Sequence, residues 1–525
     1  SRSIFVHLFI NGIYWGIYNP SERLDSDYAE LYLGGDADDY DVIKDYSDVI
    51  DGDIGAWNRL HQQSASGMKT DEAYWKIQGK NPDGTRNPMY ESLVDVDNLI
   101  DYMMINFYGG NTDWDHHNWV AMRNRVKPGN GFKFFCWDQE HVLKNVNENL
   151  LTENNPNCPS SIFQRLRQNE NFKRRFADRV QMHCFDGGVL TPQATADRMM
   201  KRSLYLEGAI DAESARWGDY RRDVHPYNTS GPFDLYTKED YWLPVRETLL
   251  NNYFPQRTDK FLAQLKEAGL FPTVSAPQLL LNGEPTGDTI AVPGDLLSLS
   301  ASRGTVYYSL DGSEPAVWNG TSTWRGSPAP DAGIYSGAFA LNHSVHLKAR
   351  TLLNGQWSAL KEAYLMVRSD FSDLKITEIQ YNPEGNELYA GSDFEFIELK
   401  NTGSSTLNLN GVAFTSGIDY TFQEAISLAP GEFIVLASNE EAFYARYGFM
   451  PHGEFDGQLS NSGELLVLIG LQGDTLCSIA YDDEKGWPEE ADGSGYSLVP
   501  VEQNPSGNQN TPGQWRSSYQ KNGSP

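Results

Sequence analysis

The sequence predicts a multidomain α+β protein, in which a mixed N-terminal region is followed by two immunoglobulin-like β-sandwiches. Its 525 residues correspond to three or so domains, at about 100–200 residues per domain. Apolar residues recur at helical spacing only up to about residue 270. Beyond that point, short stretches of alternating polar and apolar residues dominate, such as GTVYYSL and HSVHLKARTL. We therefore expect a domain at 1–270 and sandwiches at 271–368 and 369–500.

Three stretches of the N-terminal region are predicted to be helical. Leu99, Met103 and Phe107 mark the apolar face of residues 93–109. Residues 160–185 and 239–270 have the same spacing, and Gly269 is a plausible C-cap of the last helix.

The β-rich half is predicted from its turns as well as its strands. Residues 311–315, DGSEP, are typical of a hairpin turn because Asp, Gly and Pro favour tight reversals. Residues 501–525 are rich in Pro, Gly, Asn and Ser, and we expect them to form a flexible tail.

Net charge limits the classes of partner. Lys and Arg number 42 against 71 Asp and Glu, which gives 42 − 71 = −29. Such a surface repels phosphate backbones and anionic lipid, so we expect no nucleic-acid partner. No apolar run is long enough for a transmembrane segment. The four cysteines lie too far apart for a thiolate zinc site.

A polar loop follows the first predicted helix. Gly109, Gly110 and Asn111 break the helix, and residues 113–118 read DWDHHN. Two strands, NWVAMRNRV and GFKFFCWD, then form a predicted hairpin that ends on Asp138 and returns it beside Asn118. Asp113 is followed by Asn118 five residues later and by Asp138 at a strand end. Protein kinases use the same order, in which the first acid is the base and the Asn and the later Asp bind magnesium.

Alternatives remain open within this loop. Asp115 competes with Asp113 for the role of base, and either carboxylate could instead cap a backbone N–H group. Adjacent histidines cannot easily both face one ion, so we favour a surface or aromatic-packing role for His116 and His117. The acidic stretch 34–53 lacks the spacing of an EF-hand, and we expect a solvated face there.

The N-terminal region resembles the CotH (spore-coat protein H) kinase-like family. The resemblance rests on VHLFINGIYWGIYNPSERLD, NTDWDHHNW, FKFFCWDQE and ESARWGDY, which together span about residues 4–225. It implies an atypical protein-kinase-like fold, mostly the C-lobe, that uses ATP and magnesium or manganese to phosphorylate protein hydroxyls. The strands that grip the nucleotide in this fold would precede Ser1, so we expect an N-terminally truncated chain whose activity depends on those residues.

Site roles are carried over from the family by position. Asp113 would be the catalytic base, or Asp115 if the register shifts, and Asn118 and Asp138 would bind the metal. Glu140 stands where the family has a second acid that assists the metal. Glu22 and Arg23 would lie near the nucleotide. The resemblance therefore implies roles for seven residues: Asp113, Asp115, Asn118, Asp138, Glu140, Glu22 and Arg23.

The β-rich half has resemblances of its own. GTVYYSLDGSEP with HSVHLKARTLLNGQWS resembles the chitobiase/β-hexosaminidase C-terminal module, and LKITEIQYNP through LAPGEFIVLA resembles the lamin-tail domain. Such domains imply an extracellular or cell-surface location. They also keep open a second function, an inert surface protein that binds glycan or matrix, with Trp324 and Trp357 as candidate sugar-stacking residues.

Overall fold

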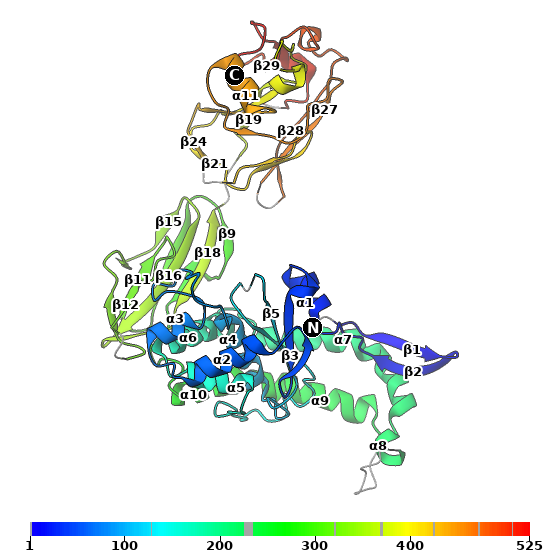
Figure 1. Ribbon diagram of the computed structural model, residues 1–525, viewed down its shortest axis with the longest axis vertical. Coiled ribbons are helices and arrows are strands. Elements are labelled where there is room, and N and C mark those ends of the chain that lie inside the picture. The colour runs from blue at the N-terminus through cyan, green and yellow to red at the C-terminus, as the bar shows by residue number, and fades with distance from the viewer. Residues whose placement is uncertain are drawn as a thin grey trace. The chain divides into compact units, whose positions relative to one another are not determined.

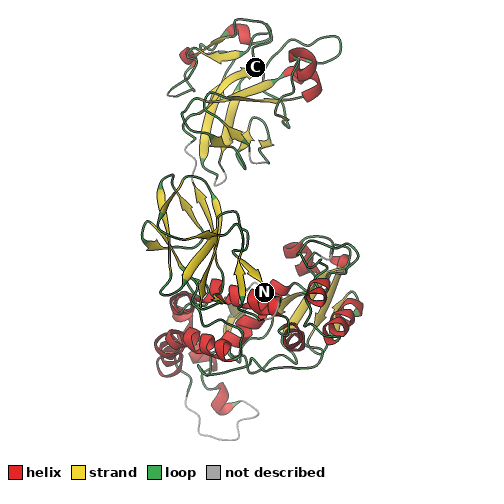
Figure 2. Ribbon diagram, turned by 90° about the vertical axis from the view of Figure 1, so that its left-hand side faces the viewer, coloured by secondary structure: helices red, strands yellow, loops and turns green. Residues whose placement is uncertain are grey.

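In the computed structural model of the chain, the polar loop connects a helix to a four-stranded antiparallel sheet (Figure 1). The structure describes residues 3–127, 129–224, 235–319, 322–367, 371–423, 426–470, 473–506 and 508–525. The chain divides into two compact units, Ser1–Val367 and Arg368–Pro525. Helices concentrate before residue 270 and strands after it, so the predicted α+β fold class is confirmed. Figure 2 shows the helices gathered mainly in one part of the ribbon and the strands mainly in the others.

The N-terminal region contains, in chain order, β1 (Val6–Ile10), β2 (Ile13–Tyr18), α1 (Ser26–Leu33), η1 (Ala37–Asp39), β3 (Tyr40–Lys44), β4 (Asp48–Asp51), α2 (Gly55–Ala65), α3 (Asp71–Lys76), α4 (Val96–Gly109), β5 (Trp119–Asn124), β6 (Lys133–Cys136), α5 (Pro159–Leu166), α6 (Glu170–Cys184), α7 (Pro192–Trp217), α8 (Tyr220–Asp223), η2 (Lys238–Trp242), α9 (Leu243–Thr248), η3 (Leu249–Tyr253) and α10 (Phe254–Glu267).

The sheet has the order β4-β3-β5-β6, with all its neighbours antiparallel. Strand β5 is central and buried along its whole length, and its first four residues, Trp119 to Met122, are apolar. Helix α4 packs on the sheet and buries Leu99, Met103 and Phe107, the face that its periodicity predicts. The predicted helix 160–185 is interrupted, because the Asn169 side chain accepts hydrogen bonds from the first backbone N–H groups of α6.

The hairpin of β1 and β2 lies beside α7 in Figure 1. The Glu213 carboxylate of α7 accepts a hydrogen bond from the backbone N–H of Ile17 at 2.6 Å. The indole N–H of Trp217 donates to the carbonyl of Trp15 at 2.5 Å. The end of α7 thus anchors this hairpin to the rest of the unit.

The first sandwich has two main sheets, β15-β10-β7-β8 and β14-β11-β16-β18-β9, with a small β12-β13 hairpin and β17 beside β16. Its strands are β7 (Gln278–Leu281), β8 (Glu284–Pro285), β9 (Thr289–Ala291), β10 (Asp295–Ser300), β11 (Thr305–Ser309), β12 (Ala316–Trp318), β13 (Gly326–Pro328), β14 (Gly333–Ile334), β15 (Phe339–Leu341), β16 (Val345–Leu353), β17 (Gln356–Trp357) and β18 (Lys361–Val367).

The first sandwich and the N-terminal region form one unit, so the predicted boundary near residue 270 separates two folds that pack together. The fully buried Arg350 of β16 is the centre of this packing. Its guanidinium contacts the carboxylates of Asp178 in α6 and Glu314 in the sandwich, each at 2.7 Å.

The second unit has a six-stranded sheet, β26-β25-β20-β19-β29-β30, and a four-stranded sheet, β23-β22-β27-β28. Its elements are β19 (Leu374–Gln380), η4 (Gly391–Phe394), β20 (Phe396–Asn401), β21 (Leu407–Asn408), β22 (Ala413–Ser416), β23 (Tyr420–Thr421), β24 (Ser427–Leu428), β25 (Phe433–Ala437), α11 (Glu440–Tyr447), β26 (Gly453–Glu454), β27 (Glu464–Ile469), β28 (Thr475–Tyr481), η5 (Glu489–Ala491), β29 (Leu498–Pro500), η6 (Pro512–Gln514) and β30 (Trp515–Ser517).

The prediction of a flexible tail at 501–525 is wrong. Strand β30 pairs antiparallel with β29, with Trp515 opposite Pro500. The Trp515 ring is buried in the core, and its indole N–H donates to the Gln509 carbonyl at 2.8 Å. A buried indole and hydrogen bonds to the sheet therefore order a segment whose composition is polar.

Among the helices that the structure describes, we find none with the length and apolar character needed to cross a membrane.

Candidate functional site

The end of α4 is fixed where the polar loop begins. Gly110 caps the helix in the left-handed conformation, at φ +60°. The buried guanidinium of Arg257, from α10, donates to the carbonyl of Tyr108 at 2.7 Å, to that of Val146 at 2.9 Å and to that of Phe107. These carbonyls include groups that a helix C-terminus leaves without partners.

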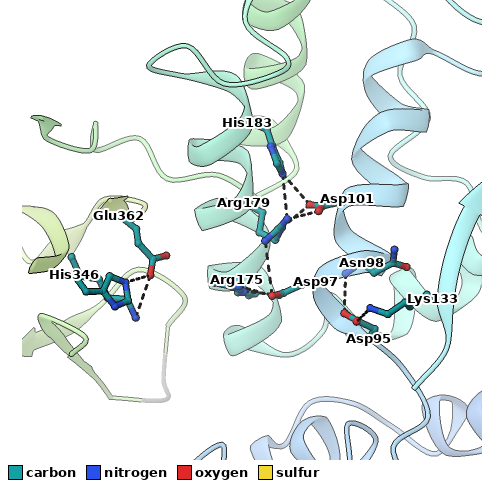
Figure 3. Close-up of polar contacts among 11 residues, drawn as sticks. Asp95, Asp97, Asn98, Asp101, Lys133, Arg175, Arg179, His183, His346 and Glu362 are labelled. Atoms are coloured by element: carbon teal, nitrogen blue, oxygen red, sulfur yellow. Dashed lines mark hydrogen bonds and ion pairs between the residues drawn. The ribbon is translucent and has the colours of Figure 1, made fainter. Parts of the chain in front are cut away.

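An ion-pair ladder holds α4 against α6 (Figure 3). Asp97 and Asp101, one turn apart on α4, face Arg175, Arg179 and His183 on α6. Arg175 donates to Asp97 at 2.6 Å, and Arg179 does the same to Asp101. The ladder fixes the helix that leads into the loop.

The hairpin of β5 and β6 places Asn118 and Asp138 at the same end of two paired strands. Trp119 pairs with Cys136, and the N–H of Trp137 donates to the Asn118 carbonyl at 3.2 Å. Asn118 and Asp138 both adopt positive φ, at +68° and +46°. Asn and Asp tolerate this conformation better than other residues with side chains, and it turns the chain at both strand ends.

Asn118 also binds Asp113 directly. Its side-chain N–H group donates to the Asp113 carbonyl at 2.9 Å and to the Asp113 carboxylate at 3.2 Å. The other carboxylate oxygen of Asp113 lies 3.3 Å from Nε2 of His117. The Asp113 side chain is a third exposed, so solvent can reach it.

Three carboxyl groups face one another at this point. A hydrogen bond with Glu140, partial burial and the negative charge of Glu140 and Asp113 together raise the pKa of Asp138. The same hydrogen bond lowers the pKa of Glu140. The predicted acids Asp113, Asp138 and Glu140 therefore lie together with Asn118.

Two sets of ligand atoms could hold a metal ion. One combines Asp113 with His116 and His117, and the other combines Asp113 with Glu140 and His141; within each set the atoms lie within 4.8 Å of one another. The carboxylate and amide oxygens suit magnesium or manganese, and imidazole is a better ligand for a transition metal than for magnesium. The residues present thus fit a divalent cation.

The histidines differ from expectation. Both rings of His116 and His117 lie beside Tyr46, with ring centroids 6.1 and 6.3 Å from it, which agrees with aromatic packing. However, each ring also has a nitrogen within 4.8 Å of an Asp113 carboxylate oxygen. His141 was not predicted to belong to the site, and its only signal in the sequence is its position next to Glu140.

Asp115 does not face this cluster. It is fully buried, and its carboxylate accepts hydrogen bonds from the Asn155 side chain at 2.7 Å and from the backbone N–H of Ser160 at 2.6 Å. Ser160 lies in the first turn of α5, so Asp115 satisfies a free N–H group of that helix. Burial raises the pKa of Asp115. This placement argues against Asp115 as the base.

Of the two predicted nucleotide-side residues, only Arg23 lines a cavity beside the site. Arg23 lines a cavity of about 80 Å³ together with Lys44, Asp45 and Trp137. Asp45 accepts a hydrogen bond from the backbone N–H of Asn118 at 2.8 Å, which connects this cavity to the cluster. Glu22 instead accepts a hydrogen bond from the Tyr32 hydroxyl at 2.6 Å.

The acidic stretch 34–53 is more than a solvated face. Asp45 supports Asn118, and the buried Asp41 pairs with Arg125 at 2.8 Å. Neither role can be recognised from charge density, because both depend on strand β3 lying beside β5.

The tryptophans proposed for sugar stacking are not on a free face. Trp357 is completely buried against Tyr307 and Trp318. Trp324 is partly buried against the core of the N-terminal region. The structure therefore contradicts this basis for a glycan site on the first sandwich.

Comparisons with known proteins agree with two of the three resemblances, those to the CotH kinase-like family and to the lamin-tail domain. Residues 1–231 match the family described as CotH kinase protein, and residues 368–483 match the Lamin Tail Domain. No curated protein matches the chain. A crystal structure of a DUF4876 family protein from Bacteroides thetaiotaomicron VPI-5482 aligns with 44% of this chain and 90% of that chain, at 13% identity and a TM-score of 0.18, values at which the similarity informs neither fold nor function. The chain therefore carries a CotH kinase domain in its N-terminal region and a lamin tail domain in its second unit.

Proposed function

We propose that the chain is an exported protein phosphotransferase that uses ATP and magnesium or manganese to phosphorylate hydroxyl groups of proteins. The observation that carries this proposal is the convergence of Asp113, Asn118, Asp138 and Glu140 at the open end of one hairpin. The match to the CotH kinase family supports the same reaction class.

Asn118, Asp138 and Glu140 would hold the cation. Because the amide N–H group of Asn118 is directed at Asp113, its amide oxygen is left for a metal. A bound divalent cation would neutralise charge on the nucleotide phosphates. The two carboxylates supply the hard oxygen ligands that magnesium and manganese prefer.

Asp113 would act as the base. In the transfer, the acceptor hydroxyl oxygen forms a bond to the γ-phosphorus while the bond from that phosphorus to the leaving ADP oxygen breaks, and the hydroxyl proton passes to the Asp113 carboxylate. Asn118 and His117 hold that carboxylate in place from either side. Its partial exposure leaves room for a protein hydroxyl to approach.

Two cationic side chains stand on the nucleotide side of the cluster. Arg23 and Lys44 line the small cavity next to Asp45. Both would contact phosphate oxygens, which attract guanidinium and ammonium groups. Glu22, bonded to Tyr32, would lie farther from the phosphates. The proposed export rests on the lamin tail domain, through its resemblance to modules of secreted and surface proteins.

The test is phosphate transfer from γ-labelled ATP by the full-length protein, to itself and to a mixture of acceptor proteins. We expect manganese- or magnesium-dependent labelling by the wild type and loss of labelling in Asp138→Ala. Asp259→Ala is the matched control, because Asp259 is an exposed acid on α10. Equal labelling by the wild type and Asp138→Ala contradicts the proposal.

Asp113→Asn separates the two roles open to Asp113. If Asp113 is the base, the transfer rate of Asp113→Asn is expected to be about 10²–10⁴-fold lower than that of the wild type, while the variant still binds manganese. Loss of transfer and of manganese binding together would instead make Asp113 a metal ligand, as the ligand sets around it allow.

A further inference from the structure

A deep cleft lies on the outer face of the six-stranded sheet in the second unit. Its volume is about 940 Å³, and strands β19, β20, β25, β29 and β30 supply its floor. Along β20, Ile397 and Leu399 point into the hydrophobic core, so the alternate residues Glu398 and Lys400 point into the cleft.

The floor carries a buried carboxylate that has no cationic partner. Glu398 is only 6% exposed, and one of its oxygens accepts a hydrogen bond from the Thr377 hydroxyl at 2.6 Å. Among the residues that the structure describes, no Lys, Arg or His nitrogen lies within 4.0 Å of this carboxylate. Burial is the main reason that the pKa of Glu398 is raised to about 7. A desolvated carboxylate without a counter-ion is costly to the folded protein.

The neighbouring lysine is already engaged elsewhere. Nζ of Lys400 donates to the Gln503 carbonyl at 3.1 Å and to the Asn504 side chain at 2.9 Å, and it lies 4.8 Å from the centre of the Phe433 ring. Lys400 therefore does not neutralise Glu398 by direct contact.

Apolar side chains stand among the polar groups that line the cleft, and the net charge of the lining is negative. Large exposed apolar side chains stand around it: Phe433, Phe449, Met450 and Tyr519. Four glutamates line it against one lysine and one arginine: Glu378, Glu398, Glu432, Glu502, Lys400 and Arg516. The lining is thus complementary to a cation with an apolar stem.

The chain itself provides an example of a peptide on this floor. Its residues 518–525 form part of the cleft, and the backbone N–H of Ser524 donates to the buried Glu378 carboxylate at 2.9 Å. The carbonyl of Asn522 accepts a hydrogen bond from the Tyr447 hydroxyl at 2.5 Å. One carboxylate of the floor therefore already binds a polypeptide backbone, and Glu398, its cross-strand partner, lines the same cleft.

We propose that this cleft binds an extended polypeptide segment of a partner protein that places a lysine side chain against Glu398. The ammonium group would pair with the free carboxylate oxygen, and the alkyl stem would pack on the aromatic wall. Lysine fits better than arginine because an ammonium group needs only the oxygen that Thr377 leaves free, whereas the two parallel hydrogen bonds of a guanidinium would have to share the oxygen that Thr377 already contacts.

The experiment measures binding of the full chain to arrayed pools of acetylated heptapeptides that are random except at the fourth position. That position is lysine, arginine, N-acetyl-lysine or glutamate. Salt at about 0.3 M limits attraction between the basic peptides and the acidic surface. We expect the lysine pool to retain about ten times more protein than the N-acetyl-lysine pool, and more than the arginine pool.

Two variants locate the preference. Glu398→Gln keeps the shape of the side chain and is expected to abolish the lysine preference, whereas Glu441→Gln, the same change at an exposed position of α11, is expected to keep it. Circular dichroism checks that both variants fold, and the comparison among pools on the wild type stands without them. Equal retention on the lysine and N-acetyl-lysine pools overturns the proposal. So does a lysine preference that Glu398→Gln leaves intact, or binding of a glucosamine hexamer in place of the peptides.

Discussion

The side-chain amide of Asn118 donates to both the carbonyl and the carboxylate of Asp113, at 2.9 and 3.2 Å. One residue thus orients the candidate base and leaves its own oxygen for a metal. The pairing of β5 with β6 places Asp138 next to Asn118, so both proposed functions of the loop depend on the same hairpin.

The two acids of the loop are expected to respond differently to substitution. Asp115→Ala leaves the Ser160 N–H and the Asn155 amide without their acceptor in the core, which costs about 1–3 kcal/mol of unfolding free energy. Asp113→Ala is expected to change stability by less than about 0.5 kcal/mol, as at a partly exposed position. Urea denaturation measures both, and equal losses of stability contradict the assignment of Asp115 to the core.

Arg257 is expected to stabilise the C-terminal end of α4, where the polar loop begins. Arg257→Ala removes three donors from buried carbonyls, including two in the last turn of α4, and should lower the unfolding free energy by about 3 kcal/mol. Arg257→Lys replaces three donor nitrogens with one and should lose less stability. Lys260→Ala, at an exposed position of the same helix, is the control. Stability of Arg257→Ala close to that of the control contradicts this role.

Arg350 joins the first sandwich to the helices of the N-terminal region. Arg350→Met leaves Asp178 and Glu314 without their shared cation, and breaking such a buried pair costs about 3–5 kcal/mol. Arg303→Met, at an exposed position of the same sandwich, should lie within about 0.5 kcal/mol of the wild type. Thermal unfolding of the full chain compares the two, and matching transitions would remove Arg350 from the account of this interface.

The stability of the second unit is expected to fall as pH rises. Burial, with the negative charge of Glu464 and Asp393, raises the pKa of Glu395 from 4.5 to about 8. Its carboxyl therefore binds a proton more tightly in the folded than in the unfolded chain, which favours folding at low pH. This contribution is fully present below pH 4.5 and is lost as pH rises through about 8, a change on the order of 3 kcal/mol.

Glu395→Gln should flatten much of this pH dependence. Glu398, whose pKa is raised to about 7, contributes in the same direction and should account for part of the remainder. Urea denaturation at several pH values, with proteolysis reporting on residues 371–525, measures the effect. A second unit that becomes more stable between pH 4.5 and 8 contradicts the cause proposed for the Glu395 shift.

The hairpin of β5 and β6 could be predicted from sequence. The contacts that other parts of the chain make with the loop could not. Two strands joined by a turn necessarily return Asp138 to Asn118, so local pattern was sufficient there. Asp113 and Asp115 cannot be told apart in this way, because their difference lies in α5, some forty residues away. Asp45 reaches Asn118 only through the pairing of β3 with β5, which periodicity does not reveal.

The incorrect prediction for residues 501–525 also came from relying on local sequence alone. Residues 501–525 have the content of a linker, yet Trp515 completes the core of the sheet. Burial of one large aromatic ring contributes a few kcal/mol, more than the surrounding polar residues oppose. The composition of the whole segment indicated a tail, and it did not reveal that the Trp515 side chain is buried.

The most direct test of the central claim is the affinity of the full-length protein for manganese, measured by electron paramagnetic resonance, in the wild type, Asp138→Asn and the control Asp259→Asn. The convergence of Asn118, Asp138 and Glu140 predicts affinity about ten-fold or more weaker in Asp138→Asn and unchanged in Asp259→Asn. The same affinity in all three proteins would contradict a metal site at the end of this hairpin.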